Sequence, residues 1–131
     1  MDELQFAEET LIIAEQMDKL SGNREVINRF IASRLYYAAH HLGRAMLKKF
    51  GEDPDSWAGA IHRRVIDELE VCLVNTGRLS RRGLQHLKTL RTKRVKADYL
   101  LNLQFQSQEK DKIFRVFREF LNEAQTLLPT L

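Results

Sequence analysis

The chain has 131 residues, of which 44% are hydrophobic and 30% charged, and its formal net charge is +3. This length and composition predict one folded domain over residues 1–131 and exclude the class of disordered chains. No run of about 18 apolar residues is present, so no membrane span is predicted. The single cysteine, Cys72, cannot form an internal disulfide, which favours a cytoplasmic location.

The first half of the chain predicts two helices. Asp2 is expected to cap a first helix that reaches about Leu20. A long second helix is expected from about Arg24 to Phe50, ending at Gly51. At 1.5 Å per residue this helix would be about 40 Å long, so it is the expected spine of a bundle. Its expected buried side chains are those of Phe30, Leu35, Ala39, Leu42 and Met46.

The second half predicts three more helices. A third is expected from about Trp57 to Asn75, with Asp55 or Ser56 as its cap. Ser80 is expected to cap a fourth helix that reaches about Leu101. A fifth is expected to begin near Ser107 and to end before Pro129. No segment shows sustained strand alternation, so the predicted fold class is all-α.

The charge is distributed unevenly along the chain. Between Val71 and Ala97 there is no Asp or Glu, whereas eight of the 21 Lys and Arg lie there, which leaves 13 basic against 18 acidic residues elsewhere. Such clustering is typical of a site for a polyanion or an acidic partner. The alternative is a solvated basic helix face.

The fourth helix carries charges where an apolar stripe should continue. Leu84, Leu87 and Leu90 are three apart, and the same spacing then leads through Arg91, Arg94 and Asp98. Arg94 and Asp98 are four apart, so they can pair on one face. One interpretation is a buried ion pair that holds two helices in register, and the other is a functional site.

The second helix has a polar seam of its own. Ser33, Tyr37, His40 and Arg44 are three and four apart on one face, and Arg34, Tyr37 and His41 form an adjacent line. This pattern indicates either a satisfied polar strip in the core or a strip that faces a ligand. His40 and His41 point about 100° apart on a helix, and no Cys or acidic residues stand at ligand spacing, so no zinc site is predicted.

Two stretches resemble one known family. Residues Ser33–Gly51, beginning Ser-Arg-Leu-Tyr-Tyr-Ala-Ala-His-His, are similar to the second helix of the HEPN (higher eukaryotes and prokaryotes nucleotide-binding) family, in its branch of small prokaryotic single-domain proteins. Arg94–Tyr99, Arg-Val-Lys-Ala-Asp-Tyr, resembles a later signature of that branch with one extra residue. His62 is similar to a histidine that opens the third helix there. The resemblance covers about residues 5 to 125.

The resemblance implies an up-and-down four-helix bundle with an additional helix, five helices in all, that forms a homodimer. It implies RNA or nucleotide binding, and in active members a metal-independent endoribonuclease site without cofactors, in which Arg steadies the phosphate and His moves the proton. Some members are toxins of toxin–antitoxin pairs, whose nucleotidyltransferase antitoxin modifies a motif tyrosine. Transferred to this sequence, the catalytic positions are Arg94, Asp98 and Tyr99. The ligand-binding positions proposed with them are Arg34, Tyr37, His41, Arg44 and Arg91.

The sequence departs from the family at one position. Tyr99 stands where the motif histidine would be, and a tyrosine with an unperturbed pKa near 10 is a poor base at neutral pH. Three alternatives follow: a toxin-like ribonuclease with His41 or His62 as the base, a dimer that binds RNA or nucleotide without cleaving it, or an interaction subunit of a larger complex.

Overall fold

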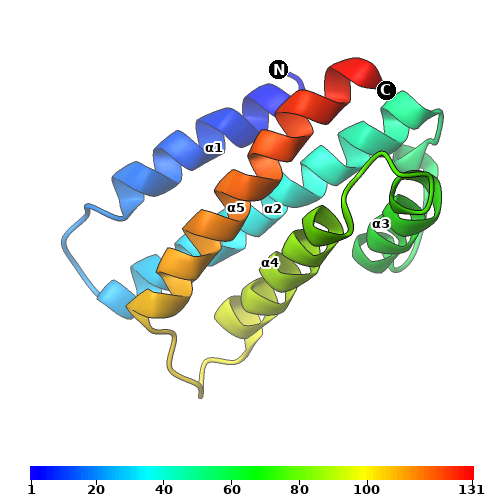
Figure 1. The fold of residues 1–131 in the computed structure, drawn as a ribbon. Coiled ribbons are helices and arrows are strands. Elements are labelled where there is room, and N and C mark those ends of the chain that lie inside the picture. Colours follow the sequence, from blue (N-terminus) through cyan, green and yellow to red (C-terminus); the bar gives the residue numbers. More distant parts are fainter.

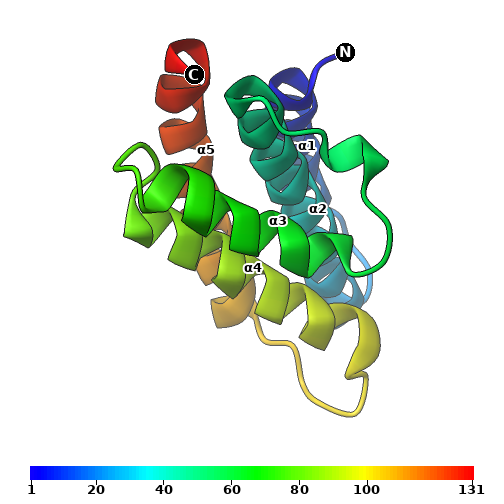
Figure 2. The ribbon, with the colours of Figure 1, turned by 90° about the vertical axis from the view of Figure 1, so that its right-hand side faces the viewer.

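The computed structural model describes residues 1–131 and is all-helical, as the sequence predicts. Its helices are α1 (Glu3–Met17), α2 (Arg24–Phe50), α3 (Ile61–Leu69), α4 (Arg81–Tyr99) and α5 (Ser107–Leu127). The long helices α1, α2, α4 and α5 form an up-and-down bundle, and α3 packs against α2 and α4 near one end (Figures 1 and 2). Both termini lie at the same end of the bundle (Figure 1).

Most helix ends form where the sequence predicts them, because polar side chains satisfy the free backbone amides there. Asp2 accepts a hydrogen bond from the amide of Gln5 at 2.7 Å, and Ser80 accepts one from the amide of Gly83 at 2.8 Å. The helix α2 has the predicted limits and ends at Gly51, whose φ of +105° suits the left-handed conformation of a helix cap.

The predicted limits of the third helix are wrong. Pro54–Ser56 forms a short 3₁₀ turn, and α3 begins only at Ile61 without a side-chain cap. Gly59, with φ +85°, puts a left-handed residue into the chain just before it, which an α-helix does not accommodate. After Leu69 the chain continues as a π-helical turn, Glu70–Val74. The connection therefore runs over the surface and brings His62 to the start of α3.

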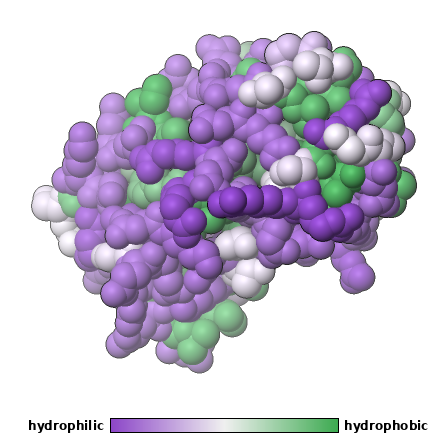
Figure 3. Space-filling model, in the orientation of Figure 1, coloured by the Kyte–Doolittle hydropathy of each residue, from purple (hydrophilic) through white to green (hydrophobic).

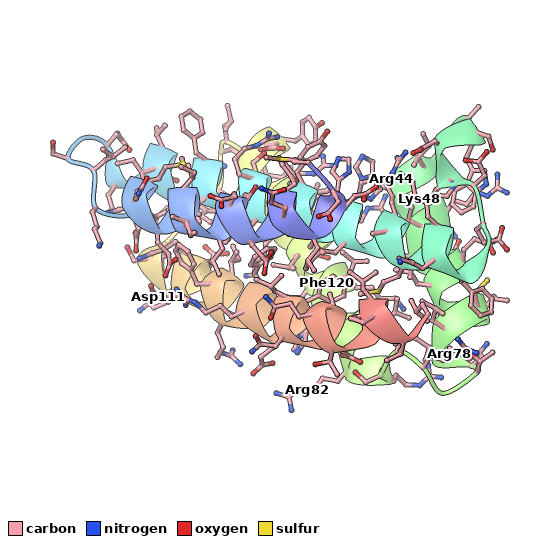
Figure 4. The ribbon with its side chains drawn as sticks, turned by 90° about the horizontal axis from the view of Figure 1, so that it is seen from above. Arg44, Lys48, Arg78, Arg82, Asp111 and Phe120 are labelled. Atoms are coloured by element: carbon pink, nitrogen blue, oxygen red, sulfur yellow. The ribbon has the colours of Figure 1, made fainter.

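The core surrounds α2. Leu35, Ala39, Leu42 and Met46 are fully buried, as predicted, and Phe120 of α5 points inward between the helices (Figure 4). The prediction that Phe30 is buried is wrong, because its side chain is 57% exposed. Phe30 lies four residues from Val26 and seven from Tyr37, on an outer line of α2 where all three side chains are exposed.

A buried arginine fixes the end of α4 to α2. Arg29, which is 7% exposed, donates hydrogen bonds to the carbonyl groups of Lys96 and Ala97, each at 3.0 Å, and to that of Leu103. The last carbonyls of a helix have no partner within the helix, so a cation there both pairs them and suits the helix dipole. Arg29 thereby holds the C-terminal turn of α4 in register with α2.

The surface carries a few separate apolar patches. One face is mostly hydrophilic, with hydrophobic atoms at its lower tip over the connection between α4 and α5 (Figure 3). Leu100, Leu101 and Leu103 are exposed in that connection. None of the helices combines the length and apolar character that a membrane crossing needs.

Candidate functional site

A cleft of about 540 Å³ opens between α2, the start of α3 and α4. Ten residues line it, and none of them is Asp or Glu. They are Tyr37, His40, His41 and Arg44 of α2, Gly59 and Ala60 of the connection, Ile61, His62 and Arg63 of α3, and Arg91 of α4. Basic and aromatic side chains from three elements therefore converge on one hollow.

The close approach of α3 depends on Gly43. A Cβ atom at this position would lie 3.1 Å from side-chain carbons of both Leu69 and Val65, and 3.6 Å from one of Leu87. Only a residue without a side chain leaves that space to α3. Gly43 lies between His40 and Arg44 on α2, so the packing that it permits places His62 against the polar seam.

The three histidines of the cleft form one cluster with two tyrosines. The ring centres of His40 and His62 are 4.3 Å apart, and those of His41 and Tyr37 are 4.5 Å apart. The hydroxyl of buried Tyr36 lies 2.7 Å from Nδ1 of His62, while Nε2 of His62 has no protein partner. Tyr36 therefore fixes the His62 ring from behind and leaves its other nitrogen available to the cleft.

The surroundings keep these histidines neutral. Burial, followed by the charges of His62 and Arg44, lowers the pKa of His40 to about 3. Burial, followed by the positive charges of Arg94, Arg91 and Arg44, lowers the pKa of His62. Burial and Arg44 also lower the pKa of His41, although Glu3 and Asp55 oppose that effect. A cation-rich cleft thus holds imidazoles that stay uncharged at neutral pH.

The arginines of the cleft differ in how far they are neutralised. Arg44 pairs with Asp55, which also pairs with Lys48 at 3.0 Å. Arg44 and Lys48 lie one turn apart along α2 (Figure 4). Arg91 is half-buried and pairs with no carboxylate. Arg63, the third lining arginine, has Asp67 at 3.8 Å, so Arg91 is the one arginine of the lining whose charge no carboxylate offsets.

Arg94 lies behind the cleft rather than in it. Its guanidinium carbon lies 5.0 Å from the ring centre of Tyr36 and 5.8 Å from that of Tyr99. Its Nε is 3.9 Å from Asp98, which accepts a hydrogen bond from the hydroxyl of Ser33 at 3.2 Å. The predicted burial of the Arg94–Asp98 ion pair is wrong, because Asp98 is exposed, whereas the link to a second helix exists through Ser33 of α2.

The structure thus separates the predicted site residues into two groups. Arg91, Tyr37, His41 and Arg44 line the cleft together. The second group, Arg94, Asp98 and Tyr99, lies beside the cleft on the last turns of α4, with Tyr99 68% exposed. Arg34 stacks on the outer side of Tyr37 at 4.9 Å. Tyr36 connects the groups, since it touches both Arg94 and His62.

The sequence did not point to Tyr36 or Arg63 as site residues, and it placed His40 only in the polar seam of the second helix. Tyr36 and His40 are four apart on α2, on the side that faces α3. This spacing could have predicted that the two side chains lie together. His62 was predicted only as an alternative base. Its hydrogen bond with Tyr36 depends on the path of the chain from Gly51 to Ile61, which local patterns do not specify.

One group of side chains elsewhere has the spacing of metal ligands. The ligand atoms of Glu52, Glu68 and Cys72 lie within 4.8 Å of one another. Burial, with the nearby charges of Glu52 and Glu68, raises the pKa of the Cys72 thiol. The free thiol is therefore protonated at neutral pH, and a metal ion bound there would have to displace this proton.

No family model matches the chain, and no curated protein matches it. The resemblance to the HEPN family therefore stays a prediction that rests on residues Ser33–Gly51 and Arg94–Tyr99.

Proposed function

We propose that this protein is a HEPN-like, cytoplasmic protein that binds RNA or a nucleotide through phosphate groups held in the cleft. The observation that carries the proposal is the lining of ten residues with three arginines, three histidines and no carboxylate. Guanidinium groups donate two parallel hydrogen bonds to phosphate oxygens, and Arg91 has no competing carboxylate. Arg44 and His41 form the supporting wall, and Tyr37 offers a ring on which a base can stack.

The test is affinity for a single-stranded RNA and for AMP as a function of salt. Removal of one cationic phosphate ligand should flatten the salt dependence by about one charge. Arg91→Gln should weaken binding about tenfold, since a charge-assisted hydrogen bond contributes about 1.5–3 kcal/mol. Arg94→Ala should weaken it because Tyr36 is then less well supported, and Tyr99→Phe should leave it unchanged. Unchanged affinity and salt slope in Arg91→Gln would remove the cleft from phosphate binding.

A second candidate function is metal-independent RNA cleavage, as in a toxin of a toxin–antitoxin pair. The juxtaposition of His62 and Arg91 in one cleft favours it, since the pair supplies a proton acceptor and a phosphate-binding group that the motif Tyr99 does not. Purified protein incubated with total RNA in EDTA should produce fragments ending in 2′,3′-cyclic phosphate. If His62→Gln and the parent protein produced fragments at the same rate, His62 would be excluded as the base.

We also propose a homodimer formed along the exposed line Val26, Phe30 and Tyr37 of α2. These side chains are 44%, 57% and 38% exposed and lie on one line of the helix. The line ends at the cleft, which Tyr37 also lines, so pairing of two copies would bring their clefts together. Phe30→Arg should convert a dimer of about 30 kDa in light scattering into a 15.3 kDa monomer with an unchanged helical circular dichroism spectrum. A parent protein that is monomeric at micromolar concentration would contradict the dimer.

The remaining alternative is an interaction subunit, with a nucleotidyltransferase as its partner. The exposed hydroxyl of Tyr99, 3.5 Å from an Arg94 nitrogen, favours it, because a modifying enzyme can reach this group. Co-expression with the nucleotidyltransferase of a neighbouring gene should then add the mass of AMP to the parent protein and not to Tyr99→Phe. An identical added mass in Tyr99→Phe would exclude Tyr99 as the modified residue.

A further inference from the structure

We propose that the cleft takes a terminal phosphate group, as carried by a nucleotide or by a 5′-phosphorylated RNA end, and that His62 takes up a proton when this group binds. The inference rests on the proposed phosphate binding and specifies both the form of phosphate and the residue that responds to it.

The charge of the cleft favours a terminal phosphate. Three arginines line it. Arg44 pairs with Asp55 and Arg63 with Asp67 at 3.8 Å, both carboxylates standing outside the lining, and Arg91 has no carboxylate partner. An internal phosphodiester brings one negative charge and two free oxygens. A terminal phosphate brings a charge of about −1.5 to −2 near pH 7 and three acceptor oxygens. Donors that converge from α2, α3 and α4 can engage three oxygens at once.

His62 is the group in the cleft whose charge depends most on such an anion. Tyr36, His40, His41 and Arg44 face it from α2, and Arg91 and Arg94 from α4. None of them is acidic, and every nearby charge that acts on His62 is positive. His41 differs, because Glu3 and Asp55 already favour its protonated form. His62 therefore lacks a counterion that a bound phosphate would provide.

The hydrogen bonds of His62 suit both protonation states. The hydroxyl of Tyr36, 2.7 Å from Nδ1, can accept from the Nδ1–H of the neutral ring and of the charged ring alike. The proton is then taken up at Nε2, and the new N–H there can donate to a phosphate oxygen in the cleft. Tyr36 is therefore a positioning residue, which holds the ring ready to accept a proton.

The direction of the pH dependence follows from these interactions. Without phosphate, burial and the arginines hold the pKa of His62 below its usual value, and a bound phosphate raises it. Between the two pKa values, binding takes up a proton, so affinity falls as pH rises, by up to about tenfold per pH unit. Above the pKa of the complex and below that of the free protein, this contribution to the pH dependence disappears.

The experiment measures proton uptake by titration calorimetry in two buffers of different ionisation enthalpy. The ligands are AMP and one short RNA prepared with either a 5′-phosphate or a 5′-hydroxyl end. The phosphorylated RNA should bind at least tenfold more tightly than the hydroxyl RNA, and with it the parent protein should take up more protons than His62→Gln does. This difference isolates His62, because the ligand phosphate has its own pKa near 6 and contributes equally to both titrations.

Two further variants separate positioning from general structure. Tyr36→Phe should reduce proton uptake while Nε2 of His62 remains in place. His86→Gln should bind as the parent does, since His86 pairs with Glu119 at 2.7 Å on the α5 side of α4. Preference for AMP over the phosphorylated RNA would assign the site to a free nucleotide, and the reverse to an RNA end.

Equal affinity for the two RNA ends, or equal proton uptake by the parent and His62→Gln, overturns the inference. In that case salt-dependent RNA binding that weakens in Arg91→Gln leaves the proposed function standing. Failure of every ligand to bind rejects both.

Discussion

Both sides of α4 carry basic side chains, but the two sides lie opposite different neighbours. Toward α5 and the turn after α3, carboxylates pair with them: Arg81 with Glu70, Arg82 with Glu119, and both Lys93 and Lys96 with Glu109. Toward α2 and α3, Arg91 has no carboxylate partner, and Arg94 is 3.9 Å from its nearest one. The basic run of the sequence is therefore largely neutralised on one side and retains its charge on the other.

This difference shows that clustering of charge in a sequence is a weak guide to clustering of potential. The carboxylates that pair with Arg82 and Lys96 come from α5, 37 and 13 residues further along the chain. The exposed Arg82–Glu119 pair contributes little to stability, but both pairs reduce the field that a polyanion would meet. The region available to an anion is thus the part of α4 that faces His62.

The largest expected effect is a loss of stability when the anchor of α4, the helix that carries both sides, is removed. Arg29→Met removes the hydrogen bonds that fix the end of α4, and the carbonyls of Lys96, which is part-buried, and Ala97, which is buried, lose their partner. We expect the free energy of unfolding, measured in urea, to fall by about 2–4 kcal/mol. Arg24→Met is the matched control on the same helix, because its ion pair with Asp18 is exposed, and it should cost less than about 1 kcal/mol. Equal decreases in the two variants would show that Arg29 does not anchor α4.

Arg29 also illustrates what the sequence could and could not predict. Helix existence follows from apolar spacing, and ends such as those at Asp2, Gly51 and Ser80 follow from local capping chemistry, so these were predictable. From side-chain type alone, Arg29 would be expected at the surface and Phe30 in the core, and the structure shows the reverse. The reason is that the neighbours of each helix face come from elements far along the chain. Local patterns carry no such information.

The candidate site was predictable in part for the same reason. The seam Tyr37, His41 and Arg44 is a property of one helix, and Arg91 was visible as a charge on an apolar stripe, so the two walls of the cleft were predicted. The hydrogen bond between Tyr36 and His62 required the path of residues 51–60 and the close approach over Gly43. Arg94 was visible on the same stripe and received a catalytic role from the resemblance, whereas the structure puts it behind Tyr36.

The second effect, of intermediate size, compares equal changes of charge on the two sides. Arg91→Gln and Arg82→Gln each remove one positive charge from α4, and Arg82 projects into solvent away from the bundle (Figure 4). We expect Arg91→Gln to weaken RNA binding about tenfold, or about 1.4 kcal/mol, and Arg82→Gln to change it less than about twofold. Affinity at fixed salt measures both. Equal weakening by the two variants would mean that net charge, rather than the cleft, attracts the RNA.

The smallest effect concerns the neutralised side itself. Glu119 pairs with Arg82 at 3.3 Å and with His86 at 2.7 Å, so Glu119→Gln exposes uncompensated positive charge without adding any basic residue. Because the pairs are at the surface, we expect the free energy of unfolding to fall by less than about 1 kcal/mol. RNA should bind slightly more tightly, with a salt slope steeper by at most about one charge, since the surface field is screened within about 8 Å at physiological ionic strength. The preference for one RNA end should not change, because Glu119 does not line the cleft.

A gain in affinity from Glu119→Gln as large as the decrease from Arg91→Gln would make all of α4 a binding surface that α5 partly covers. If Glu119→Gln increased RNA affinity only at low salt, the cleft would remain the specific site. The other side of α4 would then be a surface whose charge the carboxylates of α5 neutralise.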